Sequence, residues 1–323
     1  MEKTYLISAP IAAEMAHFRS LFQRSLVADN PLLQLVTEHI LRKSGKMMRP
    51  MLVLLTAKLL GEVNEATYRA ALALELLHNA SLVHDDVVDE SDERRGQPSV
   101  NALFNNKVAV LSGDYLLASA LLQVTYTQNL EIVRTVSQLG QDLADGELIQ
   151  LDNVGNDRFS EEVYYEVIRK KTAVLFAACT SAGALSVGAS EEQVERARQF
   201  GEYVGLCFQI RDDIFDYFDD HIGKPTGNDM KEGKLTLPVI HVLNSTQDST
   251  ATQLGVKVKH GEASKAEIAQ LIEFTKAHGG IDYAVAKMHE FEKKACDLLA
   301  SIPDSPVKQA LYAYLDCVIN RSK

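Results

Sequence analysis

The chain has 323 residues, of which 46% are hydrophobic, and this is enough for one large core or at most two domains. Its net charge of −11 disfavours a nucleic-acid-binding protein, which would more often present a basic face. The four scattered cysteines form no C-x-x-C pair and no cluster with histidines. We therefore expect reduced cysteines, and neither a disulfide framework nor a zinc site.

Neither a signal peptide nor a membrane span is expected from the sequence. The N-terminal residues lack the basic segment and sustained apolar stretch that a secretory signal needs. No uninterrupted run approaches 18 apolar residues, so we expect no transmembrane segment. These features, with the cysteine pattern, predict a cytoplasmic protein.

Most of the chain has the apolar periodicity of α-helices, and only 8 prolines and 18 glycines interrupt it. We therefore predict an all-α protein with a single domain over residues 1–323. Ser190 and Gln193 form a capping-box pattern, and Gly279-Gly280 marks a helix end. The predicted helices span residues 31–43, 49–60, 64–92, 99–127, 129–153, 160–188, 190–219, 235–244, 264–277, 281–300 and 304–320.

Two aspartate clusters with the same spacing lie in these helical segments. Residues 85–89 read D-D-V-V-D, and residues 212–216 read D-D-I-F-D. Positions four apart share a helix face, so the first and last aspartates of each cluster point the same way. Carboxylates this close repel by about 1–4 kcal/mol per pair at intermediate dielectric, which favours a cation between them. Mg²⁺ is the natural candidate, because it shares its shell between carboxylates and substrate phosphates.

Basic residues accompany the first cluster. Arg94 and Arg95 follow it, and His78 precedes it by two helical turns on the same face. Arginine forks suit the remaining oxygens of a metal-bound phosphate. His84 points away from that face, so we expect it to have a structural role. A solvated acidic face is the alternative for a single cluster, but the apolar surroundings and the repetition argue against it.

The second cluster is preceded by Gln209, which lies three residues before Asp212 and therefore on the same face. A Gly-rich loop at residues 223–238 follows it and carries Lys224 and Lys234. A mobile loop with lysines can close over a diphosphate and exclude water. An ordinary surface loop is the alternative interpretation.

Lys46 and Arg49 precede or begin a predicted helix, where an anion is favoured. This pattern is weak by itself, because a lysine and an arginine near a loop are usually solvated.

Lys171 and Thr172 lie in the middle of the apolar segment 160–188. A lysine in such a segment is costly unless it meets an anion, so this pair is a further candidate for an anion site. Tyr164 and Tyr165 precede them without any motif, and we expect both to pack in the core or at an interface.

With these motifs the chain resembles the trans-polyprenyl diphosphate synthases, the family of farnesyl, geranylgeranyl and longer-chain synthases. The resemblance covers residues 30–320 and rests on five ordered motifs. D-D-x-x-D-x-x-x-x-R-R-G at residues 85–96 and G-x-x-F-Q-x-x-D-D-x-x-D at 205–216 are highly specific together. One departure is Ser44, where the family usually has the first glycine of G-G-K-x-x-R-P. The resemblance implies an isoprenoid-synthase bundle of roughly a dozen helices around a deep central cavity, usually a homodimer.

The resemblance also implies head-to-tail condensation of isopentenyl diphosphate onto an allylic diphosphate, with about three Mg²⁺ ions per active site. Metal binding is assigned to Asp85, Asp89 and Asp212, supported by Asp86, Asp213 and Asp216. The allylic diphosphate is assigned to Arg94, Lys171 and Lys234, with Lys224 in the closing loop. Isopentenyl diphosphate is assigned to Lys46, Arg49, His78 and Arg95. The space where the allylic cation forms is lined by Thr172 and Gln209.

Two small residues bear on the length of the product. In short-chain members of the family, a bulky side chain four or five residues before the first aspartate cluster blocks elongation. Here these positions are Ser81 and Ala80, about 6–7.5 Å deeper along the helix. They predict a product of about seven to ten isoprene units, about C35–C50, which usually supplies a quinone side chain.

Other classes of protein fit the sequence less well. A short-chain synthase and a non-catalytic subunit of a heteromeric synthase remain the alternatives, although such subunits typically lose one aspartate motif. A class I terpene cyclase would usually carry an N-x-x-x-S/T-x-x-x-E motif in place of the second D-D-x-x-D. A di-iron bundle would need paired E-x-x-H motifs, which are absent.

Overall fold

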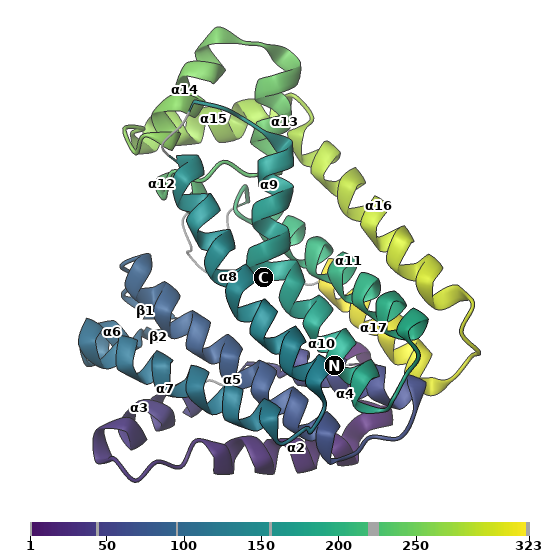
Figure 1. Ribbon diagram of the computed structural model, residues 1–323. Coiled ribbons are helices and arrows are strands. Elements are labelled where there is room, and N and C mark those ends of the chain that lie inside the picture. The colour runs from purple at the N-terminus through teal and green to yellow at the C-terminus, as the bar shows by residue number, and fades with distance from the viewer. Residues whose placement is uncertain (1, 43–44, 95, 155–156, 219–225, 321–323) are drawn as a thin grey trace. The chain divides into compact units, whose positions relative to one another are not determined.

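The computed structural model describes residues 2–42, 45–94, 96–154, 157–218 and 226–320 (Figure 1). Helices dominate these residues. Two short strands, β1 (Glu93–Arg94) and β2 (Gln97–Pro98), pair antiparallel and are the only strands in the part of the chain just defined. The prediction of an all-α protein is confirmed.

The first half of the chain contains α1 (Glu2–Ser8), the 3₁₀ turn η1 (Ala9–Ile11), α2 (Ala12–Ser25), α3 (Pro31–Arg42), α4 (Met48–Leu60), α5 (Glu65–Val88), α6 (Val100–Leu103), α7 (Asn106–Thr125) and α8 (Leu130–Val154). The second half contains α9 (Glu161–Ile168), the π-helical turn η2 (Arg169–Ala173), α10 (Val174–Ser186), α11 (Glu191–Phe215), α12 (Asn228–Lys231), α13 (Leu237–Thr246), α14 (Ser249–Lys259), α15 (Lys265–Ala277), α16 (Gly280–Ala300) and α17 (Pro306–Ile319).

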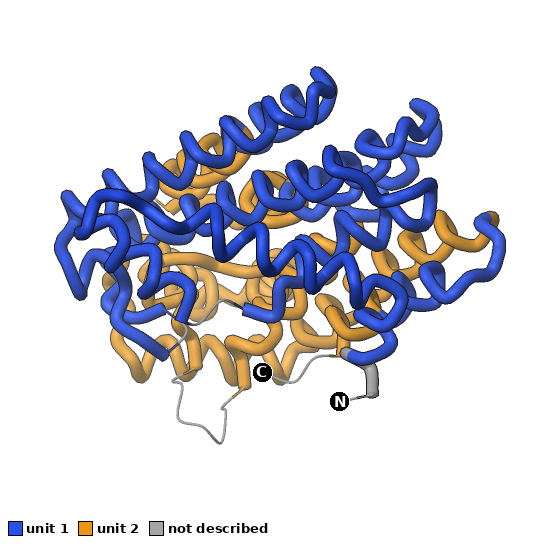
Figure 2. The backbone as a smooth tube through the Cα atoms, turned by 90° about the horizontal axis from the view of Figure 1, so that it is seen from below, with its two compact units in different colours: residues 1–141, 175–201, 302–313 blue, residues 142–174, 202–301, 314–323 orange. Residues whose placement is uncertain are grey.

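The chain forms two compact units, which Figure 2 distinguishes by colour. Unit 1 comprises residues 1–141, 175–201 and 302–313, and unit 2 comprises residues 142–174, 202–301 and 314–323. Helices α8, α11 and α17 contribute residues to both units. The expectation of a single domain over the whole chain stays a prediction.

Unit 1 is built around helices that are apolar on every side. All residues from 50 to 57 of α4 are buried, as is most of α10, and a helix of this kind belongs inside a core. Helix α5 begins at a capping box in which the Asn64 and Thr67 side chains each accept a hydrogen bond from the other's backbone N–H. Along its length α5 packs against α7 (Figure 1).

The core of unit 2 comes from the end of α11 and from α12 to α15. Its buried side chains include Tyr217, Met230, Val239, Leu254 and Leu271. Helix α13 packs against α15 and α16, and α14 packs against α15. This core supports the segments that carry the second aspartate cluster and the Gly-rich loop.

Several predicted boundaries were wrong. Helices α1, α2, α12 and α14 were missed. The predicted helix 64–92 ends at Val88, because the chain turns there into the β1–β2 hairpin. The predicted helix 99–127 is interrupted at Asn105, whose positive φ of 137° stops α6, and whose side chain caps α7 by accepting from the Val108 N–H.

Two predicted helix ends are confirmed. The Ser190 N–H donates to Gln193 Oε1 at 2.9 Å, and the Gln193 N–H donates to Ser190 Oγ at 3.3 Å, so the capping box is present. Gly279, with a φ of 77°, follows α15 in the left-handed region where glycine is favoured.

Helix α7 is the one helix in the described ranges that is long and apolar enough to cross a membrane by length and composition alone. Core helices of other proteins pass the same test. One third of its most apolar stretch is buried, where it packs against α5 in unit 1. The remaining face is exposed and carries Val110, Leu111, Tyr115, Leu121 and Leu122.

Candidate active site

The first aspartate cluster occupies the C-terminal end of α5. Asp85 and Asp86 lie in the last turn, and Asp89 is the C-cap residue, whose N–H donates to the Asp85 carbonyl at 2.8 Å. The C-terminal end of a helix carries partial negative charge, so each carboxylate here is disfavoured by about 0.3–1 kcal/mol. Three carboxylates at this position favour a cation beside them.

The middle aspartate of this cluster is buried and already has a cationic partner. Asp86 is 2% exposed, and Arg94 Nε donates to its Oδ1 at 2.7 Å. Burial raises the pKa of Asp86, while the hydrogen bond and charge of Arg94 lower it. Arg94, expected to contact the allylic diphosphate, therefore lies against Asp86 in this structure, on the wall of a small cavity of about 60 Å³.

The residues predicted to hold isopentenyl diphosphate belong to unit 1. Lys46 is exposed just before α4, Arg49 lies in its first turn, and His78 is buried on α5, which packs against α4. The Arg49 guanidinium lies 5.7 Å from the centroid of the Phe176 ring. Arg95 lies outside the described residues.

The predicted product-length residues lie on α5, one turn before the first cluster. Ala80 is buried, and Ser81 is half-buried, with its hydroxyl donating to the His78 carbonyl at 2.9 Å. Neither side chain is bulky.

The second cluster repeats the arrangement at the C-terminal end of α11. Its middle residue, Asp213, is 3% exposed, whereas Asp212 and Asp216 are half-buried. Tyr164 Oη donates to Asp213 Oδ2 at 2.6 Å, and Gln209 Nε2 donates to Asp213 Oδ1 at 2.8 Å. Burial raises the pKa of Asp213, the two hydrogen bonds lower it, and the neighbouring aspartates raise it.

Tyr164 does more than the packing that the sequence predicted. The ring is buried, as expected, but its hydroxyl is bonded to a residue of the second aspartate cluster. Nothing in the local sequence indicates this partner, which is 49 residues away along the chain.

Asp216 binds the backbone of the Gly-rich loop at residues 227–229. Its two carboxylate oxygens accept from the N–H groups of Asn228 and Asp229, at 3.0 and 3.1 Å, and its carbonyl accepts from the Gly227 N–H at 2.9 Å. The last residue of the cluster therefore orders the turn that leads into α12.

The π-helical turn η2 presents Lys171 and Thr172. Such wide turns occur mostly as single insertions in α-helices, often at functional sites. Lys171 forms an ion pair with Glu147 and donates to Gln150 Oε1 at 3.1 Å, so its anionic partner in this structure is a protein carboxylate. Gly146 permits the approach of η2 to α8, because a Cβ there would lie 2.8 Å from Lys170 Cβ.

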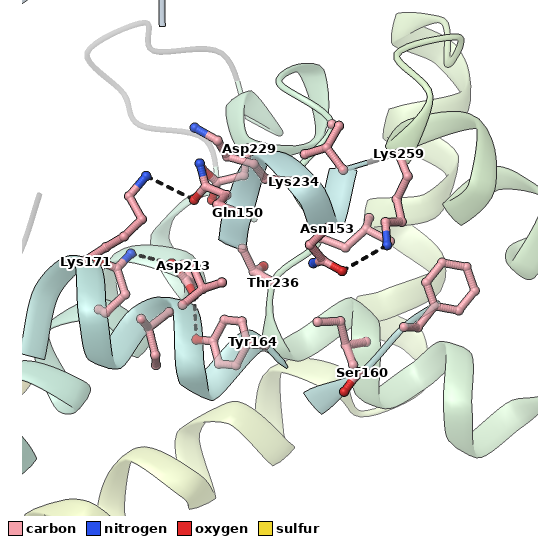
Figure 3. A pocket seen from close by; sticks show the side chains of 18 of the residues that line it. Gln150, Asn153, Ser160, Tyr164, Lys171, Asp213, Asp229, Lys234, Thr236 and Lys259 are labelled. Atoms are coloured by element: carbon pink, nitrogen blue, oxygen red, sulfur yellow. Dashed lines mark hydrogen bonds between the residues drawn. The ribbon is translucent and has the colours of Figure 1, made fainter. Parts of the chain in front are cut away.

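A cavity of about 220 Å³ in unit 2 brings these residues together (Figure 3). Its polar lining combines predicted site residues with others that the sequence did not single out. The predicted ones are Lys171, Thr172, Gln209, Asp213 and Lys234. The additional ones include Gln150, Asn153, Tyr164, Asp229 and Lys259.

The charged residues of this cavity that the sequence interpretation missed are Asp229, Lys259 and Arg158. Asp229 lies inside the Gly-rich loop motif, so a signal was present for it. Burial raises the pKa of Asp229, and the nearby Asp213 and Asp216 raise it further. Lys259 is buried and donates to the Arg158 carbonyl at 2.7 Å and to Asn153 Oδ1 at 3.4 Å. Burial lowers its pKa.

The Gly-rich loop contributes Lys234 to the cavity, where its ammonium group donates to Glu232 Oε2 at 2.7 Å. Gly233, with a φ of 77°, lies before it, and a Cβ there would lie 3.2 Å from Val154 Cγ1. Lys224, the other predicted lysine of the loop, lies outside the described residues.

The carboxylate oxygens of this site suit a hard cation that leaves some of its coordination positions for a ligand. Among the described residues, no three carboxylate, imidazole or thiol side chains converge to hold a metal ion alone. Mg²⁺ is usually bound by one or two carboxylates together with substrate phosphates. Burial and the neighbouring carboxylates raise the pKa values of Asp213 and Asp229, and a cation beside them would favour their ionised forms.

Comparison with known proteins identifies the family of this chain. The family model for polyprenyl synthetase matches residues 30–275. Octaprenyl diphosphate synthase of Escherichia coli (strain K12) is 32% identical over 314 residues, which is 97% of each chain.

Two solved structures are similar over nearly the whole chain. Geranylgeranyl pyrophosphate synthase from Bacteroides thetaiotaomicron is 56% identical, covering 99% of this chain and 100% of that one, with a TM-score of 0.89. The polyprenyl synthase from Caulobacter crescentus CB15, complexed with calcium and isoprenyl diphosphate, is 30% identical over 98% of each chain, with a TM-score of 0.92. The chain therefore belongs to the polyprenyl synthetase family and is a prenyltransferase of the polyprenyl diphosphate synthase type.

Proposed function

We propose that this enzyme condenses isopentenyl diphosphate head-to-tail onto an allylic diphosphate in a Mg²⁺-dependent reaction. One observation carries the proposal. Each aspartate cluster ends a helix at its negative pole, with the middle aspartate buried and bonded and the outer ones more exposed. A fold that places six carboxylates at two such positions is adapted to bind cations there.

Asp85, Asp89 and Asp212 are the metal ligands in this proposal, and the family resemblance gives about three ions per site. Asp86, Asp213 and Asp216 support them. Bound Mg²⁺ would stabilise the negative charge that develops on the leaving diphosphate. Support comes from the Caulobacter relative, which was crystallised with calcium and isoprenyl diphosphate.

In the proposal, the cationic residues bind the phosphate oxygens that the metal ions do not coordinate. Arg94, Lys171, Lys224 and Lys234 are assigned to the allylic diphosphate, and Lys46, Arg49, His78 and Arg95 to isopentenyl diphosphate. Arg94, Lys171 and Lys234 each contact a carboxylate now. We expect the substrate to draw them away from these partners, since a diphosphate carries more charge than one carboxylate.

The reaction itself needs little chemistry from side chains. The allylic C–O bond breaks and its electron pair leaves with diphosphate. The double bond of isopentenyl diphosphate then attacks the allylic carbon. A proton leaves the adjacent carbon, and the released diphosphate accepts it. Thr172 and Gln209 line the cavity beside this step, and water must be excluded, because it would trap the cation as an alcohol.

We propose a product of about seven to ten isoprene units, about C35–C50. The buried Ala80 and the half-buried Ser81 support it, since both side chains are small. Octaprenyl diphosphate synthase is among the relatives. A shorter C20 product is the second candidate, because the Bacteroides protein at 56% identity is a geranylgeranyl pyrophosphate synthase.

The surroundings of the enzyme are also part of the proposal. A product of this length is insoluble in water and is typical of a quinone side chain. We place the enzyme in the cytoplasm, with transient membrane contact for product release. Product release that does not respond to added lipid vesicles or detergent would contradict the membrane contact.

We propose a homodimer formed through α7. Leu111, Tyr115 and Leu122 are exposed on this helix, and their spacing of four and seven residues places them on one face. Exposed apolar patches of this kind mark interaction surfaces. A second copy of the chain is the occupant expected from the family resemblance.

Product analysis tests the proposed function. The full-length protein is incubated with Mg²⁺, farnesyl diphosphate and radiolabelled isopentenyl diphosphate, and the dephosphorylated alcohols are sized by reverse-phase chromatography. Products of about C35–C50 would support the long-chain proposal, and products ending at about C20 would favour the second candidate. No incorporation would indicate a non-catalytic subunit. Loss of activity with EDTA and its return with Mg²⁺ would support the metal requirement.

A further inference from the structure

We propose that Tyr164 is a positioning residue that acts through Asp213 and Gln209 to orient the hydroxyl group of Thr172 toward the cavity. The inference deepens the proposed function and rests on it. It concerns four side chains of unit 2 that three elements of the chain contribute: α9, the π-helical turn η2 and α11.

The four side chains form one continuous hydrogen-bond chain. Tyr164 Oη donates to Asp213 Oδ2 at 2.6 Å, and Gln209 Nε2 donates to Asp213 Oδ1 at 2.8 Å. Thr172 Oγ1 donates to Gln209 Oε1 at 2.7 Å. All four residues line the same cavity of about 220 Å³, in which Tyr164 and Asp213 are drawn with their hydrogen bond (Figure 3).

The chain of bonds has a direction, and Asp213 sets it. A carboxylate only accepts hydrogen bonds, so Gln209 must turn its NH₂ group toward Asp213. The amide oxygen of Gln209 then faces Thr172. An amide oxygen also only accepts, so the Thr172 hydroxyl must be the donor. Each step fixes the next, from a carboxylate to an amide to a hydroxyl.

The consequence for Thr172 is chemical. Its one hydroxyl hydrogen is used by Gln209, so only oxygen lone pairs remain for a ligand in the cavity. An oxygen with its hydrogen committed presents partial negative charge. Such a group favours a carbon that becomes positive, and it costs no reorganisation when the charge develops.

Tyr164 holds the carboxylate of Asp213, from which the hydrogen-bond chain begins. Asp213 is buried, and the outer residues of its cluster are more exposed than it is. Tyr164 is buried as well, and the Tyr165 ring packs against it with centroids 5.4 Å apart. With one carboxylate oxygen bonded to Tyr164, the other is left to orient Gln209. Without the Tyr164 hydroxyl the carboxylate can rotate, and Gln209 and Thr172 can follow.

The chain offers a matched control beside Tyr164. Tyr165 belongs to the same helix and is half-buried, and its ring contacts Tyr164 and Phe291. It does not line the cavity that holds the four residues. Tyr165→Phe therefore removes a hydroxyl of the same kind from the same helix without touching the hydrogen-bond chain.

A double-mutant cycle tests the inference. Full-length Tyr164→Phe, Thr172→Val, the double variant and Tyr165→Phe are assayed for kcat and for KM of both substrates at saturating Mg²⁺. We expect Tyr164→Phe to lower kcat by about 10- to 100-fold, as misplacement of a reacting group does, with both KM values within about twofold. Once Thr172 lacks its hydroxyl, adding Tyr164→Phe should change kcat by less than about twofold. Tyr165→Phe should retain the wild-type kcat.

Three outcomes would overturn the inference. If the fold losses in kcat of Tyr164→Phe and Thr172→Val multiply in the double variant, the two residues act independently. A Tyr164→Phe variant with normal kcat and a raised KM or a raised Mg²⁺ requirement would mean that Tyr164 serves binding. An equal loss of kcat in Tyr165→Phe would indicate a general packing effect.

Two further measurements keep the test decisive. If Tyr164→Phe does not fold by circular dichroism, Gln209→Met takes its place in the cycle with Thr172→Val, and multiplying penalties again overturn the inference. Thr172→Ser keeps a hydroxyl and should recover most of the kcat that Thr172→Val loses. A wild-type protein without prenyl-transfer activity would overturn the proposed function. If the wild type is active but the losses in kcat multiply in the double variant, only the role of Tyr164 is overturned.

Discussion

The imidazole of His84 on α5 lies directly over Gly113 on α7, where any side chain would overlap the ring. His84 Nε2 also lies 3.2 Å from the Val110 carbonyl and 3.4 Å from a carboxylate oxygen of Asp114. The structural role predicted for this histidine fits these contacts. They hold the end of α5, next to Asp85, against α7.

Gly113→Ala should destabilise the protein by about 1–3 kcal/mol, because the added methyl group overpacks the contact with His84. Urea unfolding followed by circular dichroism measures the change. Gly140→Ala is the matched control on α8, since nothing lies within 4 Å of a Cβ at that glycine. It should be neutral or stabilising by up to about 1 kcal/mol, as alanine is the better helix former. Equal destabilisation of the two variants would contradict this account.

Ala80→Phe should shorten the product. The substitution fills the buried position one turn before the first aspartate cluster, where elongation is expected to pass. We expect chromatography of the dephosphorylated products to move from about C35–C50 toward about C15–C20, with about 1–3 kcal/mol of destabilisation from overpacking. Leu103→Phe, at an exposed residue of α6, is the control and should leave the product length unchanged. An unchanged product in Ala80→Phe would place the determinant elsewhere.

Asp212→Asn should lower kcat by about 100-fold or more, because a metal ligand is lost. In EDTA the same variant should unfold at an unchanged or higher temperature, since one carboxylate is removed from the negative end of α11. Asp85→Asn should behave alike at the end of α5. Thermal melts with and without Mg²⁺, beside steady-state kinetics, measure both effects. Stabilisation by Mg²⁺ that is equal in the variants and the wild type would argue against these aspartates as ligands.

The capping box of α15 predicts a loss of stability in acid. Glu267 forms an ion pair with Lys257 and accepts from the Ser264 N–H at 2.8 Å. The contact with Lys257 is the larger cause and the cap the smaller, and together they lower the pKa of Glu267 to about 2. The folded pKa lies below the ordinary value of about 4.3, so the stabilisation is present above that value and is lost as the pH falls toward 2. The difference in melting temperature between wild type and Glu267→Gln should therefore shrink between pH 6 and pH 3. A constant difference would contradict the role of the charge.

Leu111→Arg combined with Leu122→Arg should convert the proposed dimer into a monomer, because two charges on the exposed face of α7 oppose its burial. Light scattering after size-exclusion chromatography measures the mass. Leu35→Arg, at a similarly exposed leucine of α3, is the control and should stay dimeric. Equal masses for wild type and the α7 variant would contradict a dimer interface at this face of α7.

The fold class and the two aspartate clusters were accessible from the sequence because both depend on local spacing. Apolar periodicity indicated most helices, and D-D-x-x-D placed its outer aspartates on one face. Helices α2 and α14 are as amphipathic as α11 and α15, which were predicted, so the sequence contained a signal for them that was missed. The break at Asn105 depends on a positive φ, for which asparagine alone is only a weak signal.

The partners of the site residues were not accessible, because they depend on tertiary contacts. Lys171 was expected to need an anion, but Glu147 as that anion comes from a different helix. Tyr164 is bonded to Asp213 across 49 residues of sequence, and an apolar helix pattern says nothing about where a hydroxyl points. The burial of the middle aspartates, which separates their role from that of the outer ones, also follows only from packing.

The π-helical turn η2 makes the site sensitive to the length of the chain as well as to its residues. A π-turn contains one residue more than an α-helical turn and is intrinsically less favourable, so the packing around it must keep the extra residue in place. Deleting Arg169 or Lys170 would let the regular hydrogen bonds of an α-helix form again. It would also rotate the chain by about 100°, one residue of helix, and shift Thr172 relative to Tyr164. A homologue with a gap at position 169 or 170 would keep every motif and still lose the register on which the cavity depends.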